Sequence, residues 1–194
     1  MSVPPEFPAG EYEFRWHRAR AALEAAGVDG LLLTSEANYR YFSGHFSRFW
    51  VSKARPFLML LPREREPVLL MTDNQFPLAS ETSPVRDIRS WEGFMPEAIP
   101  ALAGAIRDAG LANGRIGVEL GFKQRMGMPF NEFIRLREMV PGAAFVDAAD
   151  LLWELRMIKS PAEVAYLRES IRITCGAYDA AFAAARPGMT EREI

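Results

Sequence analysis

The sequence predicts an α/β fold, with a mixed, mostly parallel-type sheet flanked by helices and followed by a long C-terminal linker helix. Short apolar segments alternate with amphipathic helical segments along most of the chain, which is typical of a parallel or mixed sheet. Several of the apolar segments are continuous rather than alternating, as in strands that are covered on both faces. A strong helix start at Ser160 precedes a long segment of helical periodicity, which predicts the linker helix.

Each element follows from its local pattern. Residues 11–26 carry an apolar stripe at three- and four-residue spacing, and Gly27 provides a left-handed stop. The other segments expected to be helical are 36–42, 97–109 and 129–140. The segments expected to form strands are 31–33, 57–61, 68–71, 85–91, 115–120 and 144–146. Because residues 62–67 are charged and turn-like, the strands on either side of them are expected to form a hairpin or to lie side by side.

Composition excludes several classes of protein. The chain has 194 residues, enough for one domain or one domain and part of another at roughly 150 residues per domain. With 23 Lys and Arg against 25 Asp and Glu it has no basic excess, so we expect no nucleic-acid partner. No apolar segment is long enough to span a membrane, so no membrane partner is expected. The single cysteine, Cys175, favours a reducing compartment, and we expect a cytoplasmic location.

The two ends of the chain have distinct patterns. Residues 1–10 contain three prolines and no apolar core, so they are expected to be a flexible leader rather than a signal peptide. Residues 11–157 are expected to form the α/β domain, and residues 158–194 the linker helix and the truncated start of a second domain. The capping pattern at Thr190 supports that truncation, because it predicts a further helix. A frayed natural C-terminus is the alternative.

The linker helix is expected to run from Ser160 to about Ala185. Its apolar face consists of Val164, Leu167, Ile171, Cys175, Tyr178 and Phe182. Cys175 is therefore expected to be buried and inert. The face can pack on its own domain, or it can be covered by an absent domain, in which case the exposed face is expected to cause self-association or domain swapping.

No catalytic or metal-binding motif occurs in the sequence. The only histidines are His17 and His45, and neither a His-Glu-x-x-His motif nor a Gly-x-Ser-x-Gly motif is present. We therefore expect no catalytic residue, metal ligand or cofactor in this chain.

The segment from His45 to Pro56 is the best candidate for function. It combines aromatic and cationic side chains, namely His45, Phe46, Arg48, Phe49, Trp50, Lys53 and Arg55. Such side chains can form a wall for a small anionic or zwitterionic substrate, with Arg55 binding a carboxylate through two hydrogen bonds. The alternative is that Phe49 and Trp50 simply cover the sheet while the cations are solvated.

A series of motifs resembles one known family, the N-terminal domain of the creatinase, prolidase and aminopeptidase P superfamily of pita-bread metallohydrolases. The segment Asn38-Tyr39-Arg40-Tyr41-Phe42-Ser43-Gly44 is similar to the family's Asn-x-x-Tyr-x-[Ser/Thr]-Gly. The other matching residues are Arg15, Arg18, Arg20, Leu23, Gly27, Asp29, Gly30, segment 31–35, Arg55-Pro56, segment 155–160, Glu163, Leu167 and segment 186–191.

The resemblance implies a two-domain hydrolase whose absent C-terminal domain holds two divalent metal ions. Creatinase-like enzymes place the region around His45 near the active site of the partner subunit, which implies that His45, Trp50, Arg55 and Arg48 are substrate contacts. The implied partners are the chain's own catalytic domain, a second copy in a homodimer, and a small peptide or other small-molecule substrate.

Three functions remain open for the intact protein. The first is that this chain is the non-catalytic dimerisation and pocket-walling domain of a dinuclear metal-dependent Xaa-Pro peptidase. The second is the same role in a creatinase-like C–N hydrolase. The third is a non-enzymatic interaction module.

Overall fold

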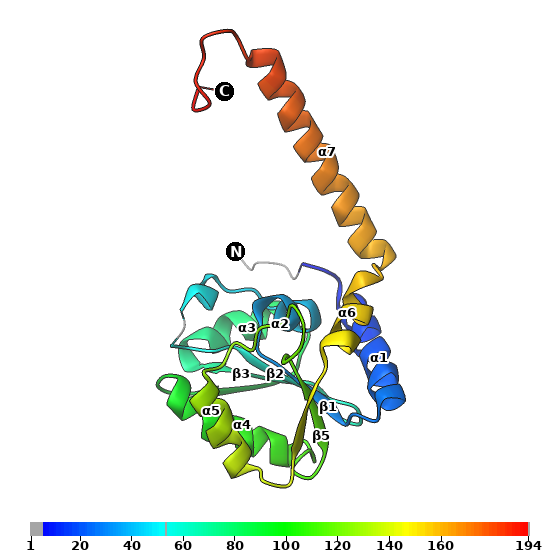
Figure 1. The fold of residues 1–194 in the computed structure, drawn as a ribbon, viewed down its shortest axis with the longest axis vertical. Helices are drawn as coiled ribbons and strands as arrows, with labels where there is room; N and C mark the ends of the chain where they lie inside the picture. The colour runs from blue at the N-terminus through cyan, green and yellow to red at the C-terminus, as the bar shows by residue number, and fades with distance from the viewer. Residues whose placement is uncertain (1–5, 53, 194) are drawn as a thin grey trace. The chain divides into compact units, whose positions relative to one another are not determined.

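The structure, a computed structural model, describes residues 6–52 and 54–193. The chain divides into two compact units, residues 1–156 and 157–194. The first unit is an α/β domain built on one sheet, with strand order β4-β3-β2-β1-β5-β6 (Figure 1). Its architecture confirms the predicted fold class.

The strands and helices alternate along the chain as expected. The strands are β1 Gly30–Leu33, β2 Leu58–Pro62, β3 Val68–Thr72, β4 Asp87–Trp91, β5 Arg115–Val118 and β6 Ala144–Asp147. The α-helices of this unit are α1 Ala9–Ala26, α2 Glu36–Ser43, α3 Phe76–Thr82, α4 Met95–Asp108, α5 Phe130–Met139 and α6 Ala149–Met157, which reaches the unit boundary. Two short 3-10 helices complete the unit, η1 Arg48–Val51 and η2 Asp73–Gln75.

The sheet is mixed, with β2 as its antiparallel member. β1 and β3 both pair antiparallel with β2, which joins β3 in the expected hairpin. The pairs β1–β5, β3–β4 and β5–β6 are parallel. The carboxyl ends of all strands except β2 therefore point to one edge, where segments 34–38 and 119–129 leave the sheet. Because Leu33 pairs with Met59, the segment that leads into β2 reaches this edge as well.

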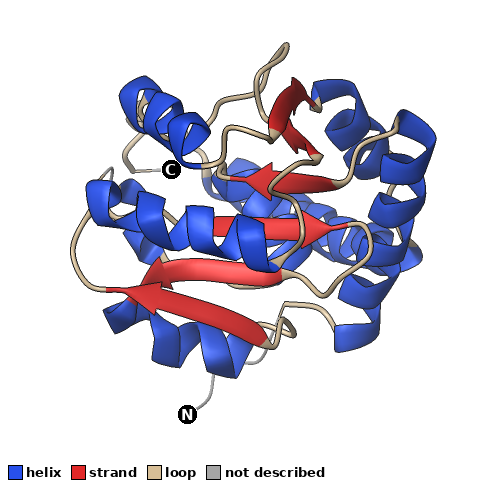
Figure 2. Cartoon of the chain, turned by 90° about the horizontal axis from the view of Figure 1, so that it is seen from below, coloured by secondary structure: helices blue, strands red, loops and turns tan. Residues whose placement is uncertain are grey.

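Both faces of the central strands are buried. Leu32, Leu58 and Leu60 pack in one core cluster with apolar residues of α4 and α5. The intervening residues of β1 and β2, such as Leu31 and Met59, are fully buried as well. Helices cover both faces of the sheet (Figure 2). This explains the continuous apolar segments, since each fully buried Leu stabilises the fold by roughly 2 kcal/mol.

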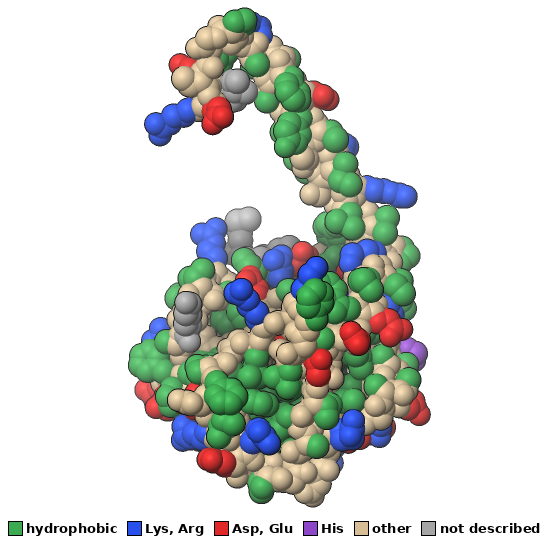
Figure 3. Space-filling view, in the orientation of Figure 1, with side chains coloured by type: hydrophobic (Ala, Val, Ile, Leu, Met, Phe, Trp, Pro, Cys, Tyr) green, Lys and Arg blue, Asp and Glu red, His purple; other side chains and the backbone are tan. Residues whose placement is uncertain are grey.

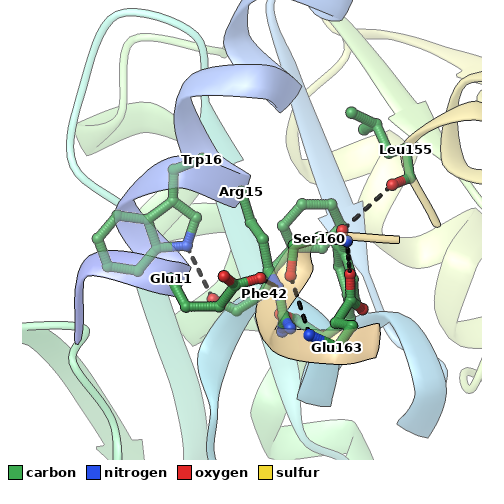
Figure 4. Close-up of polar contacts among 8 residues, drawn as sticks. Glu11, Arg15, Trp16, Phe42, Leu155, Ser160 and Glu163 are labelled. Atoms are coloured by element: carbon green, nitrogen blue, oxygen red, sulfur yellow. Dashed lines mark hydrogen bonds and ion pairs between the residues drawn. The ribbon is translucent and has the colours of Figure 1, made fainter. Parts of the chain in front are cut away.

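Part of the segment expected to be a flexible leader, residues 1–10, packs against the domain. Residues 1–5 lie outside the described part, but Phe7 is buried and contacts Tyr12 edge to face at 6.2 Å between ring centroids. The guanidinium of Arg15 lies 4.5 Å from the Phe7 ring centroid, and its Nε forms an ion pair with Glu11 at 3.0 Å. On the same helix, Trp16 donates to the carbonyl of Phe42 at 2.8 Å (Figure 4).

The second unit consists mainly of helix α7, Pro161–Ala184. The predicted capping box is present: Glu163 N donates to Ser160 Oγ at 3.1 Å and Ser160 N donates to Glu163 Oε2 at 2.8 Å (Figure 4). Apolar side chains are exposed along the helix (Figure 3). The expectation that Cys175 is buried is wrong, because its thiol is exposed on a helix that has no buried residue beyond its cap. Within the described ranges, no helix has the length and apolar character needed to cross a bilayer.

Candidate functional site

A buried carboxylate organises the edge of the sheet where β1 and β5 end. Glu119 directly follows β5 and is 2% exposed. It accepts hydrogen bonds from Thr34 N at 2.8 Å and Thr34 Oγ1 at 2.6 Å, at the end of β1. Ser35 adds its backbone N–H and its hydroxyl, and Asn38 Nδ2 of α2 donates at 2.7 Å. These convergent donors provide the stabilisation that a buried charge requires.

The same network fixes the loop that follows Glu119. Thr34 Oγ1 accepts from Gly127 N at 2.7 Å, and Asn38 Nδ2 also lies 3.1 Å from Gln124 Oε1. A Cβ atom at Gly127 would lie 2.2 Å from the carbonyl oxygen of Thr34, so only glycine permits this approach. Asn38 Oδ1 accepts from Arg156 at 2.8 Å. Glu119 thus holds segment 124–127 against the end of β1.

This loop forms one wall of a pocket of about 300 Å³, which we call the Trp50–Arg55 pocket. Its lining residues are Trp50, Ser52, Arg55, Pro56, Met126, Gly127, Met128 and Pro129. The wall around Met126 is mainly apolar, while Arg55 supplies a cation. No acidic residue is among the described lining residues, so the pocket favours a ligand that carries a carboxylate and an apolar part.

Two residues that line this pocket carry polar groups with no hydrogen-bond acceptor among the described residues. The Arg55 guanidinium lies 5.0 Å from the ring centroid of Phe94 and makes no hydrogen bond or ion pair within the described ranges. The indole N–H of Trp50 is buried and has no acceptor in the described part of the chain. The Trp50 ring itself is held by Tyr39 and Phe57, with centroids 5.3 and 5.0 Å away. The pocket therefore has a fixed aromatic wall and, in Arg55, a cation that no acidic residue of the described ranges neutralises.

His45 lies elsewhere, inside the aromatic core. It is fully buried, and its Nδ1 lies 3.0 Å from the Tyr39 hydroxyl. Its ring packs against Phe57 at 5.4 Å between centroids. Burial lowers the pKa of His45 to about 4, so the imidazole is neutral near pH 7. Burial also raises the pKa of the Tyr39 hydroxyl well above its usual range. His45 therefore contacts Tyr39 and Phe57, which hold the Trp50 ring, and does not itself line the Trp50–Arg55 pocket.

Arg48 lines a different pocket. This pocket, of about 430 Å³, is called the Arg40–Arg48 pocket here. Its lining residues are Glu6, Arg40, Gly44, Phe46, Ser47, Arg48, Leu78 and Thr82. The structure thus brings Trp50 and Arg55 together, separates Arg48 from them and buries His45. Lys53 lies outside the described residues.

Sequence reasoning missed Glu119, and it gave no role to the Glu119 donors Thr34 and Ser35, which it noted only within the matching segment 31–35. One signal was available: polar residues stand immediately after two apolar strands, and parallel strands bring their carboxyl ends to one edge. The contact of Glu119 with Asn38 depends on the placement of α2, which no local pattern shows.

The described residues do not supply a dinuclear metal centre. Among them, no three His, Cys, Asp or Glu side chains gather in a way that could hold a metal ion. The buried Glu119 carboxylate already accepts hydrogen bonds from Thr34, Ser35 and Asn38.

Comparison with known proteins identifies relatives across most of the chain. Residues 15–158 match the model of the creatinase/prolidase N-terminal domain. An uncharacterised hydrolase/peptidase of Sinorhizobium fredii is 24% identical over 200 residues, covering 98% of this chain and 49% of the relative. A creatinase of a Bacillus species is 23% identical over 192 residues, covering 99% of this chain and 44% of the relative.

A solved structure shows the same fold. The Xaa-Pro dipeptidase of Bacillus anthracis aligns with a TM-score of 0.74 at 23% identity, over 94% of this chain and 46% of that one. The chain spans about half the length of the curated relatives that it matches.

Proposed function

Because this chain belongs to the family of creatinase/prolidase N-terminal domains, we propose that it is the non-catalytic domain of an Xaa-Pro peptidase. In this proposal it builds a homodimer and walls the substrate pocket, while the other half of the intact protein holds two divalent metal ions. Those metals would activate the hydrolytic water. The residues of this chain bind and orient the substrate.

The observation that carries the proposal is the Trp50–Arg55 pocket. Arg55 offers a guanidinium without an acidic partner in the described ranges, and this group matches the carboxylate of a dipeptide. Trp50 and the apolar wall at Met126 and Met128 suit a compact, apolar ring such as that of proline. The pocket lies at the edge where the carboxyl ends of the parallel strands meet, which is the usual ligand-binding edge of such sheets.

A creatinase-like function is the competing proposal, because the Bacillus creatinase is among the relatives. Creatine also carries a carboxylate, so Arg55 suits both substrates. The two differ in the group next to that carboxylate, which is a pyrrolidine ring in one case and a charged guanidino group in the other. The absence of an acidic lining residue in the described part of the pocket favours the uncharged ring.

Substrate turnover by the whole protein tests this proposal. The whole protein, supplied with Mn²⁺, is expected to hydrolyse Ala-Pro faster than Ala-Ala and to leave creatine intact. The isolated 194-residue chain under the same conditions is expected to hydrolyse none of them. Turnover of creatine without turnover of Ala-Pro would contradict the peptidase assignment. Ala-Pro hydrolysis by the isolated chain would contradict the proposal that catalysis takes place in the other half of the protein.

A further inference from the structure

Helix η1 contributes to both pockets at once. Its residue Trp50 lines the Trp50–Arg55 pocket, and Arg48, two positions earlier, lines the Arg40–Arg48 pocket. The two pockets share no lining residue. The volume of the second pocket, about 430 Å³, falls in the range of roughly 300–1,000 Å³ that small-molecule sites occupy.

The Arg40–Arg48 pocket has an excess of positive charge. Arg48 is exposed and makes no hydrogen bond or ion pair with any described residue. Arg40 donates through Nε to Glu6 Oε2 at 3.0 Å, and its other guanidinium nitrogens have no acceptor within the described ranges. Glu6 therefore balances one of the two cations, and the second is available to an anion.

The neutral polar groups of this pocket are already engaged. Ser47 Oγ donates to Gln75 Oε1 at 2.8 Å and accepts from Phe49 N at 3.1 Å. Thr82 Oγ1 donates to the carbonyl of Leu78 at 2.8 Å. The remaining capacity for hydrogen bonding lies in the guanidinium groups, which can only donate. The ligand that this set of groups recognises is consequently an acceptor with negative charge.

An apolar surface adjoins these cations. The Phe46 ring is 45% exposed, and the Arg40 guanidinium lies 4.6 Å from its centroid. The half-buried side chain of Leu78 also lines the pocket. A ring held by a cation on one side keeps a defined face for a second apolar group.

We propose that the Arg40–Arg48 pocket is a second binding site, which takes a small carboxylate with an apolar or aromatic portion. The carboxylate pairs with Arg48, and the apolar portion lies against Phe46 and Leu78. Because Arg48 and Trp50 belong to the same 3-10 turn, an occupant paired with Arg48 contacts the turn that also carries the Trp50 wall of the other pocket.

Calorimetric titration of the 194-residue chain with phenylacetate tests the proposal. We expect saturable binding that Arg48→Gln weakens by about tenfold, the effect of losing a charge-assisted hydrogen bond. Arg137→Gln is the matched control, because Arg137 is an exposed arginine of α5 that lines neither pocket. It should bind phenylacetate like the unaltered chain.

Titrations with two further ligands and with a second variant test the proposal from other directions. Phenylacetamide, the neutral analogue, should bind much more weakly than phenylacetate, and so should acetate, which lacks the apolar ring. Binding that Arg55→Gln removes and Arg48→Gln leaves unchanged would place phenylacetate in the other pocket and overturn the proposal. An absence of saturable binding, or equal affinity for acetate and phenylacetate, would overturn it as well.

Discussion

Glu119 shows how a single buried side chain determines the geometry of the loop beside the candidate site. Its carboxylate has no arginine or lysine partner within the described ranges, yet it accepts hydrogen bonds from two backbone N–H groups and three side chains. An ionised acceptor suits this arrangement, because every group that faces it is a donor. The hydrogen bond from Gly127 N to Thr34 Oγ1, which fixes the loop, depends on the same arrangement.

We predict that Glu119→Gln lowers the free energy of unfolding by about 2–3 kcal/mol, because the new amide turns a donor towards groups that already donate. Chemical denaturation of the chain, followed by far-UV circular dichroism, measures the change. Glu36→Gln is the control, since Glu36 is an exposed carboxylate on α2, and it should change the stability by less than about 0.5 kcal/mol. Equal effects of the two substitutions would contradict the role given to Glu119.

The pH dependence of stability should report on His45. Its pKa is about 4 in the folded chain and near 6.5 when unfolded, so the unfolded state binds more protons between these values. Stability is therefore lost as the pH falls from 6.5 towards 4, by up to roughly 3 kcal/mol from this residue.

Unfolding free energies measured at pH 7 and pH 4.5 test the effect. His45→Phe is expected to be less stable than the unaltered chain at pH 7, because the Tyr39 hydroxyl loses its hydrogen bond to the imidazole, but to lose less stability on acidification. His17→Gln, at an exposed position, should keep the original pH dependence. An identical loss in the His45 variant would show that another group is responsible.

For single residues, the sequence predicts which residue types belong to the candidate segment better than it predicts which side chains contact one another. The aromatic and cationic segment points to His45, Arg48, Trp50 and Arg55 together, and the structure places only Trp50 and Arg55 at one pocket. His45 and Arg48 belong to the same segment, but a turn of η1 and the packing of Tyr39 direct them elsewhere. Those directions depend on tertiary packing, which spacing along the chain does not reveal.

The secondary-structure elements are more predictable than these contacts. The apolar segments of β1, β2 and β3 and the stripes of α1 and α4 were clear because burial on defined faces imposes a pattern. Helices α3 and α6 were not predicted. Helices α3 and α6, of 7 and 9 residues, are not followed by a glycine stop of the kind that marks the similarly short α2 at Gly44.

Helix α7 carries an apolar stripe that its own unit leaves exposed. Ile171 is 60% exposed and Tyr178 is 62% exposed. We predict that the isolated 194-residue chain self-associates through this stripe, because exposed apolar surface of this extent favours burial against a second copy. Sedimentation velocity over a range of chain concentrations measures the association.

A matched pair of substitutions localises the contact. Ile171→Glu should shift the chain to the monomer, whereas Ile173→Glu should not, because residues two positions apart lie on nearly opposite sides of a helix. Both side chains are similarly exposed, at 60% and 58%. A monomer at all concentrations, or equal effects of the two substitutions, would contradict association through this stripe.

At the scale of the whole molecule, the chain provides a scaffold that presents its pocket at one edge of a sheet. The order of motifs along the sequence was sufficient to identify the family, since the family model matches residues 15–158. The fold followed from the same motifs, and the B. anthracis dipeptidase shares it at a TM-score of 0.74. The pocket could not be derived in this way, because its wall at Met126 is positioned through hydrogen bonds that join Glu119 and Gly127 to Thr34, which is far from both in the sequence.

The kinetics of Ala-Pro hydrolysis by the whole protein carrying Arg55→Gln provide the most direct test of the proposed function. If Arg55 binds the substrate carboxylate, KM should rise by at least about tenfold while the metal content stays unchanged, and Arg137→Gln should leave KM unaltered. An unchanged KM in the Arg55 variant would contradict the claim that this chain shapes the substrate pocket.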